Sequence, residues 1–88
     1  MFALLQRPQA ARQLRRLRKT HHSLIEQIQK AITGLAANPR PPGAKRLVNR
    51  AEWRIRVSDF RILYEIEDVG QTVTIAPIAN RRDVYKQK

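Results

Sequence analysis

The stretch EWRIRVSDFRILYEI, residues 52–66, constrains the fold more than any other part of the chain. Apolar and polar residues alternate on both sides of Ser58-Asp59, which is the pattern of two antiparallel strands joined by a two-residue turn. With this turn, Trp53 lies opposite Tyr64. Because side chains alternate between the faces of a sheet, the hairpin gathers on one face Trp53, Ile55, Val57, Phe60, Ile62 and Tyr64. We predict that this face belongs to the core.

The opposite face of the predicted hairpin carries Arg54, Arg56 and Arg61. The register places Arg56 directly opposite Arg61, and like charges in that position destabilise a sheet. A polar face that is only solvated ordinarily mixes both charge signs, whereas the acid nearby in register here is Glu65. We therefore interpret the guanidinium groups as a binding site for an anionic ligand.

The charge of the whole chain supports this interpretation. The formal net charge is +11, and residues 1–50 hold eleven Lys and Arg against the single acid Glu26. Such a chain attracts polyanions, and its excess of arginine over lysine favours bidentate contacts with phosphate over a merely soluble basic surface. Nucleic acid, an acidic protein or an anionic membrane is therefore the expected class of partner.

Cysteine usage and apolar runs bear on the location of the protein. The sequence has no cysteine, which excludes disulfides, thiolate metal ligands and cysteine nucleophiles. The apolar run at residues 2–6 is shorter than the core of a signal peptide and precedes the basic residues, and no later run approaches a membrane span. We expect a soluble, cytoplasmic protein without membrane attachment.

The first half of the chain predicts a strand at residues 2–6 and two helices. The first helix covers residues 8–19, beginning at a proline. The second has Thr20 or Ser23 as its expected N-cap, with Glu26 completing a capping box. Apolar residues at helical spacing mark the buried sides of both helices: Ala10, Leu14, Leu17, Ile25, Ile28, Ile32 and Leu35.

Three β segments follow the Pro/Gly-rich connection NPRPPGAKR. They span residues 52–57, 60–66 and 72–79, and Pro77 places the last of them near a sheet edge or a bulge. The order predicts an α+β fold: an N-terminal strand, two helices, then an antiparallel β-meander with the helices packed on one face. Because the chain is short, we expect one domain over residues 1–88.

These features resemble the RelE-like ribonuclease toxins of bacterial toxin–antitoxin modules, in the RelE/ParE superfamily. The resemblance covers most of the chain. It is carried by the hairpin WRIRVSDFRILYEI, by ITGLAANPRPPGAKRL, a helix ending in Asn-Pro before a Pro/Gly loop, and by NRRDVY, which looks like the family's terminal signature.

The resemblance implies a ribosome-dependent endoribonuclease that cleaves messenger RNA in the A site and inhibits translation. The ribose 2′-OH attacks the adjacent phosphate, which yields a 2′,3′-cyclic phosphate and a 5′-OH. By the same resemblance, Arg54 acts near the 2′-OH and Arg56 binds the phosphate. Arg61 stabilises the transition state, Arg81 is the general acid or a phosphate clamp, and Tyr85 stacks on the substrate base. It also implies a neutralising cognate antitoxin, DNA-binding and co-repressing, and no cofactor.

Two departures from the family pattern concern the general base. Some members hold lysine where this chain has Arg54 and Arg56, and arginine stays protonated in proteins. Asn80 stands where a histidine is often found. Catalysis then depends on charge stabilisation and positioning by the ribosome, or on an acid such as Glu52 or Asp83 as the base.

Further basic residues are expected to contact RNA or the ribosome through phosphates. They are Arg12, Arg15, Arg16, Arg18 and Lys19 in the first helix, Lys45, Arg46 and Arg50 after the Pro/Gly-rich connection, and Arg82 near the end. The pair His21-His22 has no Asp, Glu or His partner at ligand spacing, so we expect an exposed pair and no metal site.

Two other functions stay open on the sequence. One is a ParE-like toxin that poisons DNA gyrase by binding, without cutting RNA. That class usually lacks the arginine and tyrosine set, so Arg61, Arg81 and Tyr85 together favour cleavage. The other is a non-enzymatic basic module that binds RNA or DNA.

Overall fold

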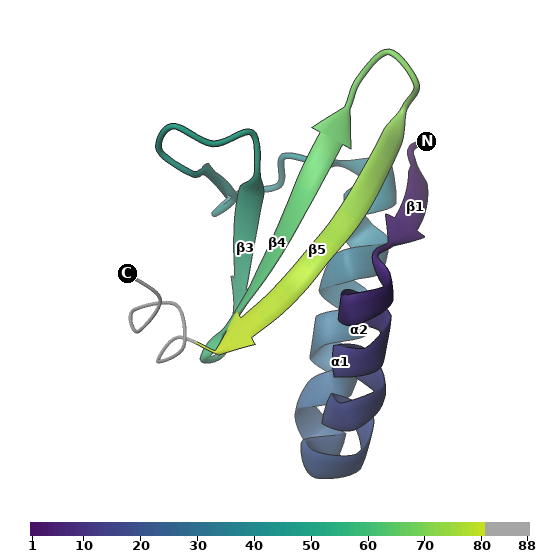
Figure 1. Ribbon diagram of the computed structural model, residues 1–88, viewed down its shortest axis with the longest axis vertical. Helices are drawn as coiled ribbons and strands as arrows, with labels where there is room; N and C mark the ends of the chain where they lie inside the picture. The colour runs from purple at the N-terminus through teal and green to yellow at the C-terminus, as the bar shows by residue number, and fades with distance from the viewer. Residues whose placement is uncertain (81–88) are drawn as a thin grey trace.

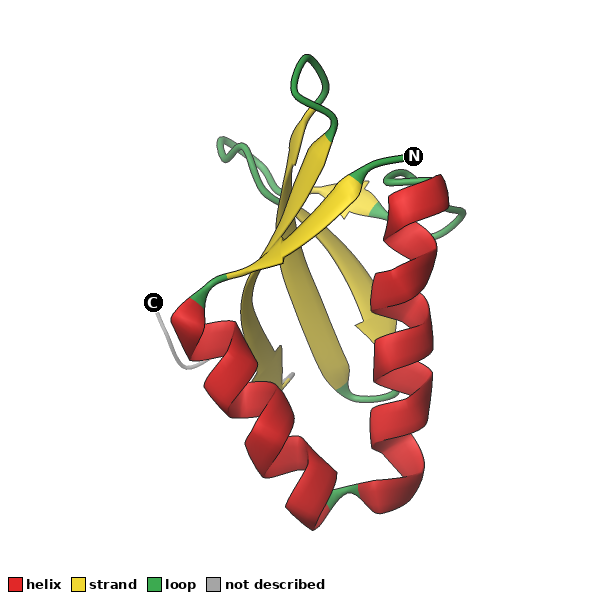
Figure 2. Cartoon of the chain, turned by 90° about the vertical axis from the view of Figure 1, so that its right-hand side faces the viewer, coloured by secondary structure: helices red, strands yellow, loops and turns green. Residues whose placement is uncertain are grey.

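In the computed structural model, which describes residues 1–80, the chain folds into two helices and one mixed sheet. The elements are β1 (Ala3–Gln6), α1 (Pro8–Thr20), α2 (His22–Ala37), β2 (Lys45–Arg46), β3 (Trp53–Val57), β4 (Phe60–Glu67) and β5 (Thr72–Asn80). The strand order is β1-β5-β4-β3-β2. Both helices lie on the same face of the sheet (Figure 1, Figure 2). The predicted α+β class, with its helices on one face, is confirmed.

The central hairpin has the predicted register. β3 and β4 pair antiparallel from Trp53 opposite Tyr64 to Val57 opposite Phe60. Ser58 adopts a φ of 55° in the turn. That left-handed conformation costs a residue with a Cβ roughly 1 kcal/mol, and the tight turn requires it. The turn thus fixes which side chains of both strands face the helices.

β1 pairs with the last described strand rather than with its neighbours in sequence. It runs parallel to β5, from Ala3 opposite Thr72 to Gln6 opposite Ile75. The expected antiparallel meander therefore forms only part of the sheet. A parallel pair between segments so far apart is set by tertiary packing, so local alternation does not reveal it.

β5 contains the bulge that Pro77 predicts. The pairing of β4 with β5 shifts between Ile62 and Tyr64, so that two residues of β5 face Leu63. Proline has no backbone N–H to donate to the ladder, and a bulge is one of the few places in a sheet that accept it.

α1 closes the edge of β5 beyond the end of β1. β1 stops pairing at Ile75, three residues before Ile78. The backbone N–H of Ile78 donates to Oε1 of Gln13, a side chain of α1, at 2.6 Å. One side chain thereby replaces a strand as the hydrogen-bond partner at this point.

The core lies between the helices and the sheet, and the predicted apolar stripes form it. α1 and α2 contribute Ala10, Leu14, Leu17, Ile25, Ile28, Ile32 and Leu35; the sheet contributes Ile55, Val57, Phe60, Ile62, Tyr64, Val73, Ile75 and Ile78. Trp53 packs against this cluster while partly exposed. Within residues 1–80, no helix has the length and apolar character needed to cross a membrane.

The junction between the helices differs from the prediction. α1 continues to Thr20 and α2 begins at His22, so His21 is the N-cap, with no side-chain capping hydrogen bond. The expected cap at Thr20 or Ser23, with its capping box to Glu26, is therefore wrong. Ser23 already lies within the first turn of α2, and Thr20 donates its hydroxyl back to a backbone carbonyl of α1 at 3.0 Å.

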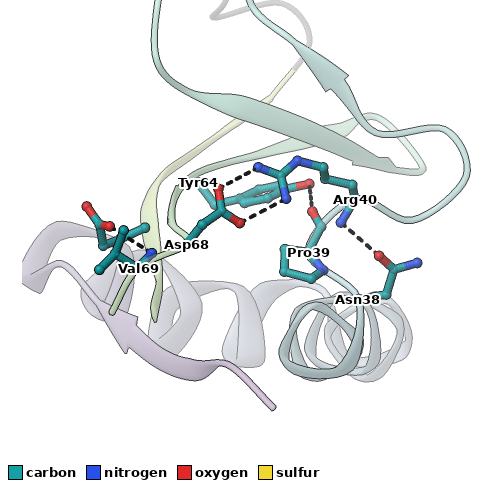
Figure 3. A network of polar contacts seen from close by, with 7 residues as sticks. Asn38, Pro39, Arg40, Tyr64, Asp68 and Val69 are labelled. Carbon is teal, nitrogen blue, oxygen red and sulfur yellow. Dashed lines mark hydrogen bonds and ion pairs between the residues drawn. The ribbon is translucent and has the colours of Figure 1, made fainter. Parts of the chain in front are cut away.

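A polar network holds the Pro/Gly-rich connection against the sheet (Figure 3). The hydroxyl of the buried Tyr64 donates to the carbonyl of Pro39 at 2.7 Å. Beside it, Arg40 donates two hydrogen bonds to the carboxylate of Asp68, at 3.2 and 3.0 Å. The guanidinium carbon of Arg40 also lies 5.2 Å from the ring centroid of Trp53.

The protonation states of this network follow from its surroundings. Burial raises the pKa of Tyr64 to about 12, although the nearby charge of Arg40 lowers it in part. The hydrogen bond from Arg40 holds the pKa of Asp68 below its ordinary value. At neutral pH the phenol is therefore neutral and the Arg40–Asp68 pair is ionised.

Candidate nucleic-acid interface

The sheet face opposite the helices, which we call the outer face, carries the predicted arginines. Its side chains follow from the strand register and include Leu5, Lys45, Arg54, Arg56, Arg61, Leu63, Glu65 and Thr74. Arg54 and Arg61 are half-buried and Arg56 is exposed. The sequence prediction that these three arginines share the face away from the core is confirmed.

Cations occupy neighbouring positions at the hairpin end of the outer face. Arg56 lies directly opposite Arg61, and Lys45 lies directly opposite Arg54. Cβ atoms of directly opposed residues are roughly 4.5–5.5 Å apart, so the side chains of each pair can reach the same anionic group. A phosphate between the strands would accept hydrogen bonds from several guanidinium groups at once.

The other end of the outer face is nearly neutral. Glu65 pairs with Thr74, and Thr74 pairs with Leu5 of β1. Arg7, which follows β1, forms an ion pair with Glu65. The positive potential of this face is therefore concentrated around Arg54, Arg56 and Arg61.

Glu52 lies at the edge of this concentration of charge, two residues before Arg54. Its carboxylate accepts two hydrogen bonds from Arg50, both at 2.9 Å. It precedes Arg56 by four residues of extended chain, which at roughly 3.3 Å per residue amounts to about 13 Å. Glu52 is thus held by a cation of its own loop and does not contact the position between Arg56 and Arg61. The other acid considered as a base, Asp83, lies outside the described residues.

The basic residues of α1 form a separate surface on the helical layer. Arg12, Arg15 and Arg18 line a hollow of about 340 Å³ between α1, α2 and the end of β1, together with Gln6 and Gln29. Arg16 and Lys19 are also exposed on α1. The residues expected to contact phosphate are therefore divided between two faces of the molecule.

The loop between β2 and β3 carries Arg46 and Arg50. Nε of Arg46 donates to the carbonyl of Arg50 at 3.4 Å, and Arg50 also binds Glu52. Lys45, Arg46 and Arg50 are all exposed, as contacts with an external phosphate require. The loop adjoins the outer face through the pairing of Lys45 with Arg54.

Several predicted site residues lie outside the described part of the chain: Arg81, Arg82 and Tyr85. The strand that leads to them ends at Asn80, which pairs with Phe60 next to Arg61.

His21 contacts Phe60 edge to face, with ring centroids 5.4 Å apart, and its Nδ1 lies 2.8 Å from the hydroxyl of Thr20.

Sequence reasoning gave no role to Leu63, although it is an apolar side chain on the outer face. Its position on this face could have been predicted from the alternation, because the predicted register already paired it with Arg54. The bulge that brings Pro77 opposite Leu63 could be predicted only in part from the sequence. A proline indicates a bulge or an edge but does not say which residue of the neighbouring strand it faces.

The chain resembles solved structures of toxins and of toxin–antitoxin complexes. The YoeB/ParE toxin from Agrobacterium tumefaciens has a TM-score of 0.79 at 17% identity, covering 90% of this chain and 98% of that chain. The isolated E. coli RelE toxin has a TM-score of 0.77 at 21% identity, covering 99% and 94%. The toxin–antitoxin complex RelBE2 from Mycobacterium tuberculosis has a TM-score of 0.73 at 22% identity, covering 91% and 98%. The fold is that of the RelE-like toxins.

The sequence assigns the family. The family model described as ParE toxin of type II toxin-antitoxin system, parDE, matches residues 4–85. A comparison with curated protein sequences gives no significant match. The chain belongs to this ParE toxin family, within the RelE/ParE superfamily, and is a toxin of a type II toxin–antitoxin system.

Proposed function

We propose that this toxin is a ribosome-dependent endoribonuclease that cuts messenger RNA in the A site. The observation that carries the proposal is the row of cations on the outer face, where Arg56 opposes Arg61 and Lys45 opposes Arg54. Cleavage by the ribose 2′-OH passes through a dianionic phosphorane, and cations already placed around it lower its energy. A face with several neighbouring cations suits that reaction.

Each arginine of the outer face has a distinct part in the proposed reaction. Arg61 stabilises the charge of the phosphorane, Arg56 binds the phosphate from the opposite strand, and Arg54 acts near the 2′-OH. Arg81, as general acid or phosphate clamp, and Tyr85, as the residue stacked on the base, complete the set from outside the described residues. These assignments rest on the family resemblance of the motifs around each residue.

The proposed dependence on the ribosome follows from the chemistry of arginine. A guanidinium group stays protonated and is a poor general base. Glu52, which is one of the two acids considered as the base, has both carboxylate oxygens hydrogen-bonded to Arg50. The ribosome is then required to position the 2′-OH in line with the phosphate, which can contribute as much as a catalytic group.

A cognate antitoxin is the second proposed partner. The solved structures of RelBE2 and of E. coli RelBE are toxin–antitoxin complexes. An acidic segment of such a partner would pair with Arg54, Arg56 and Arg61 and occlude the RNA site at the same time. Binding to the helical layer alone, with the outer face still open to RNA, would contradict this masking mechanism.

The test is primer extension on translated messages after induction of the toxin, with and without substitution of Arg61. We expect cuts that require ribosomes, and we expect R61A to reduce the cleavage rate about 10²–10³-fold. K30A is the control, because Lys30 is an exposed cation of α2 on the helical layer. Efficient cleavage of naked RNA, unaffected by ribosomes, or an R61A protein as toxic as the parent, would refute the proposal.

Gyrase poisoning is the second candidate function, because the matching family model is described as a ParE toxin. The two functions separate in a supercoiling assay with purified gyrase. Inhibition of gyrase that persists in R61A, with no cuts in translated messages, would select the gyrase function. Ribosome or DNA binding without either effect would instead indicate a non-enzymatic basic module.

A further inference from the structure

Leu63 is an apolar side chain of the outer face, at the boundary between its cationic part and its neutral end. It lies directly opposite Arg54 on β3, and it follows Arg61 by two residues on the same side of β4. It is half-buried but does not belong to the core cluster or to the apolar residues packed against that cluster. Within the described residues, its apolar surface is therefore not part of the core packing.

The β5 bulge widens this apolar surface. Two consecutive residues, Ala76 and Pro77, face Leu63 where the β4–β5 register shifts. Ala76 is 3% exposed and Pro77 is half-buried, so Pro77 and Leu63 supply the accessible apolar surface. Neither residue carries a side-chain polar group. The surface they make is bordered by Arg54 and Arg61 and, on the side of the neutral end, by Glu65, which is paired with Arg7.

An apolar floor beside guanidinium groups matches the chemistry of a nucleotide. A nucleotide joins a flat, largely apolar base to a phosphate, and single-stranded nucleic acid is bound by combining a cationic groove with surfaces on which bases stack. Successive positions on one side of a strand are roughly 6.6 Å apart, which is close to the distance between a base and its own phosphate. A bare phosphate would gain nothing from Leu63.

We propose that Leu63 and Pro77 form the floor of a base-binding subsite, next to the arginines that bind the scissile phosphate. The inference rests on the proposed ribonuclease function and adds a positioning residue to it. In this arrangement the base of a nucleotide adjoining the cut lies on Leu63, while its phosphate is bound by Arg61 and Arg56. Leu63 thereby sets the position of the phosphate along the strand direction.

The experiment is a double-mutant cycle between the protein and the RNA. The probe is a short single-stranded RNA with a 2′-deoxy nucleotide at the cut, so that it binds without being cleaved. Matched probes lack one base at the nucleotide on either side of the cut. Binding of each probe to the parent and to L63A is measured at low salt, and thermal unfolding of both proteins is recorded alongside.

We expect removal of one of these bases to weaken binding to the parent about fivefold, roughly the effect of one apolar side-chain contact. L63A should weaken binding of the intact RNA by about the same factor. Combining L63A with the abasic RNA should weaken binding little further, because the two changes remove one shared contact. L63M should retain the parent affinity. L5A is the matched control, since Leu5 is a leucine on the same face, 51% exposed, in the neutral end.

Each contrary result overturns the inference in a recognisable way. Equal effects of L63A on intact and abasic RNA, or no measurable binding of any probe, would remove the base subsite. If L63A weakens only antitoxin binding, the apolar surface belongs to the protein partner instead. The ribonuclease proposal is judged separately, because R61A tests cleavage on translated messages whether or not Leu63 contacts a base.

Discussion

One phenol joins the core of the sheet to the connection after α2. Tyr64 is fully buried, and its hydroxyl donates to the carbonyl of Pro39. Ionisation would leave a negative charge against a carbonyl oxygen in apolar surroundings. The pKa of Tyr64 is accordingly raised by burial to about 12.

This pKa predicts a loss of stability at high pH. The folded-state pKa of Tyr64, about 12, lies above the ordinary tyrosine value of 10.0, so the unfolded chain releases its phenol proton first as the pH rises. The contribution is therefore complete below pH 10.0 and is lost as the pH rises towards about 12. Ultraviolet titration should show one tyrosine ionising near the upper value, and Y64F should remove that transition.

Y64F also tests the hydrogen bond itself. It leaves the carbonyl of Pro39 without its phenol donor, which we expect to lower the free energy of unfolding by about 1–3 kcal/mol in urea denaturation. A folded parent in which every tyrosine ionises at its ordinary pKa would contradict the buried position of Tyr64.

At the scale of the elements, one side-chain hydrogen bond adds to the apolar packing of α1 against β5. Gln13 accepts a hydrogen bond from the backbone of Ile78 just beyond the bulge and past the end of β1. We expect Q13A to lower the free energy of unfolding by about 1 kcal/mol and to speed hydrogen exchange at the Ile78 amide. Gln9, exposed on the same helix, supplies the control Q9A. Equal exchange at Ile78 in Q13A and Q9A would show that the contact contributes nothing.

The elements also show how far the sequence alone reaches. The β3–β4 register and the outward arginines were predictable, because alternation and a two-residue turn leave one consistent pairing. The cap of α2 was not, because α1 runs on to Thr20 and leaves His21 as the only residue between the helices. The place of Glu52 was also not predictable, since its partner Arg50 reaches it through the geometry of the β2–β3 loop.

At the scale of the whole molecule, the cations form two surfaces instead of one. Arg54, Arg56 and Arg61 lie on the outer face, whereas Arg12 and Arg15 line the hollow on the helical layer. A partner as large as the ribosome can contact both surfaces, while a short RNA strand on the outer face reaches only the first. We therefore expect substitutions on the helical layer to affect positioning on the ribosome, and substitutions on the outer face to affect cleavage.

This division predicts the salt dependence of binding. We expect ribosome affinity to fall steeply with salt, and R12A or R15A to reduce the slope of log affinity against log salt by about one each. The cut position should be unchanged in both variants, because neither residue is on the outer face. R16A, on a neighbouring exposed position of α1, should weaken ribosome binding in the same way. Affinity that stays flat from low to moderate salt would argue against a polyanionic partner.

The parallel pairing of β1 with β5 sets the order in which a newly made chain can fold. Ala3 and its neighbours are synthesised well before their strand partner, which begins at Thr72. Until that partner emerges, β1 has no neighbour, and the helices after it have only part of a sheet to cover. The outer face, whose β4 lies between β3 and β5, is likewise incomplete until then. Synthesis from the N-terminus therefore completes the outer face only after β5 has been made.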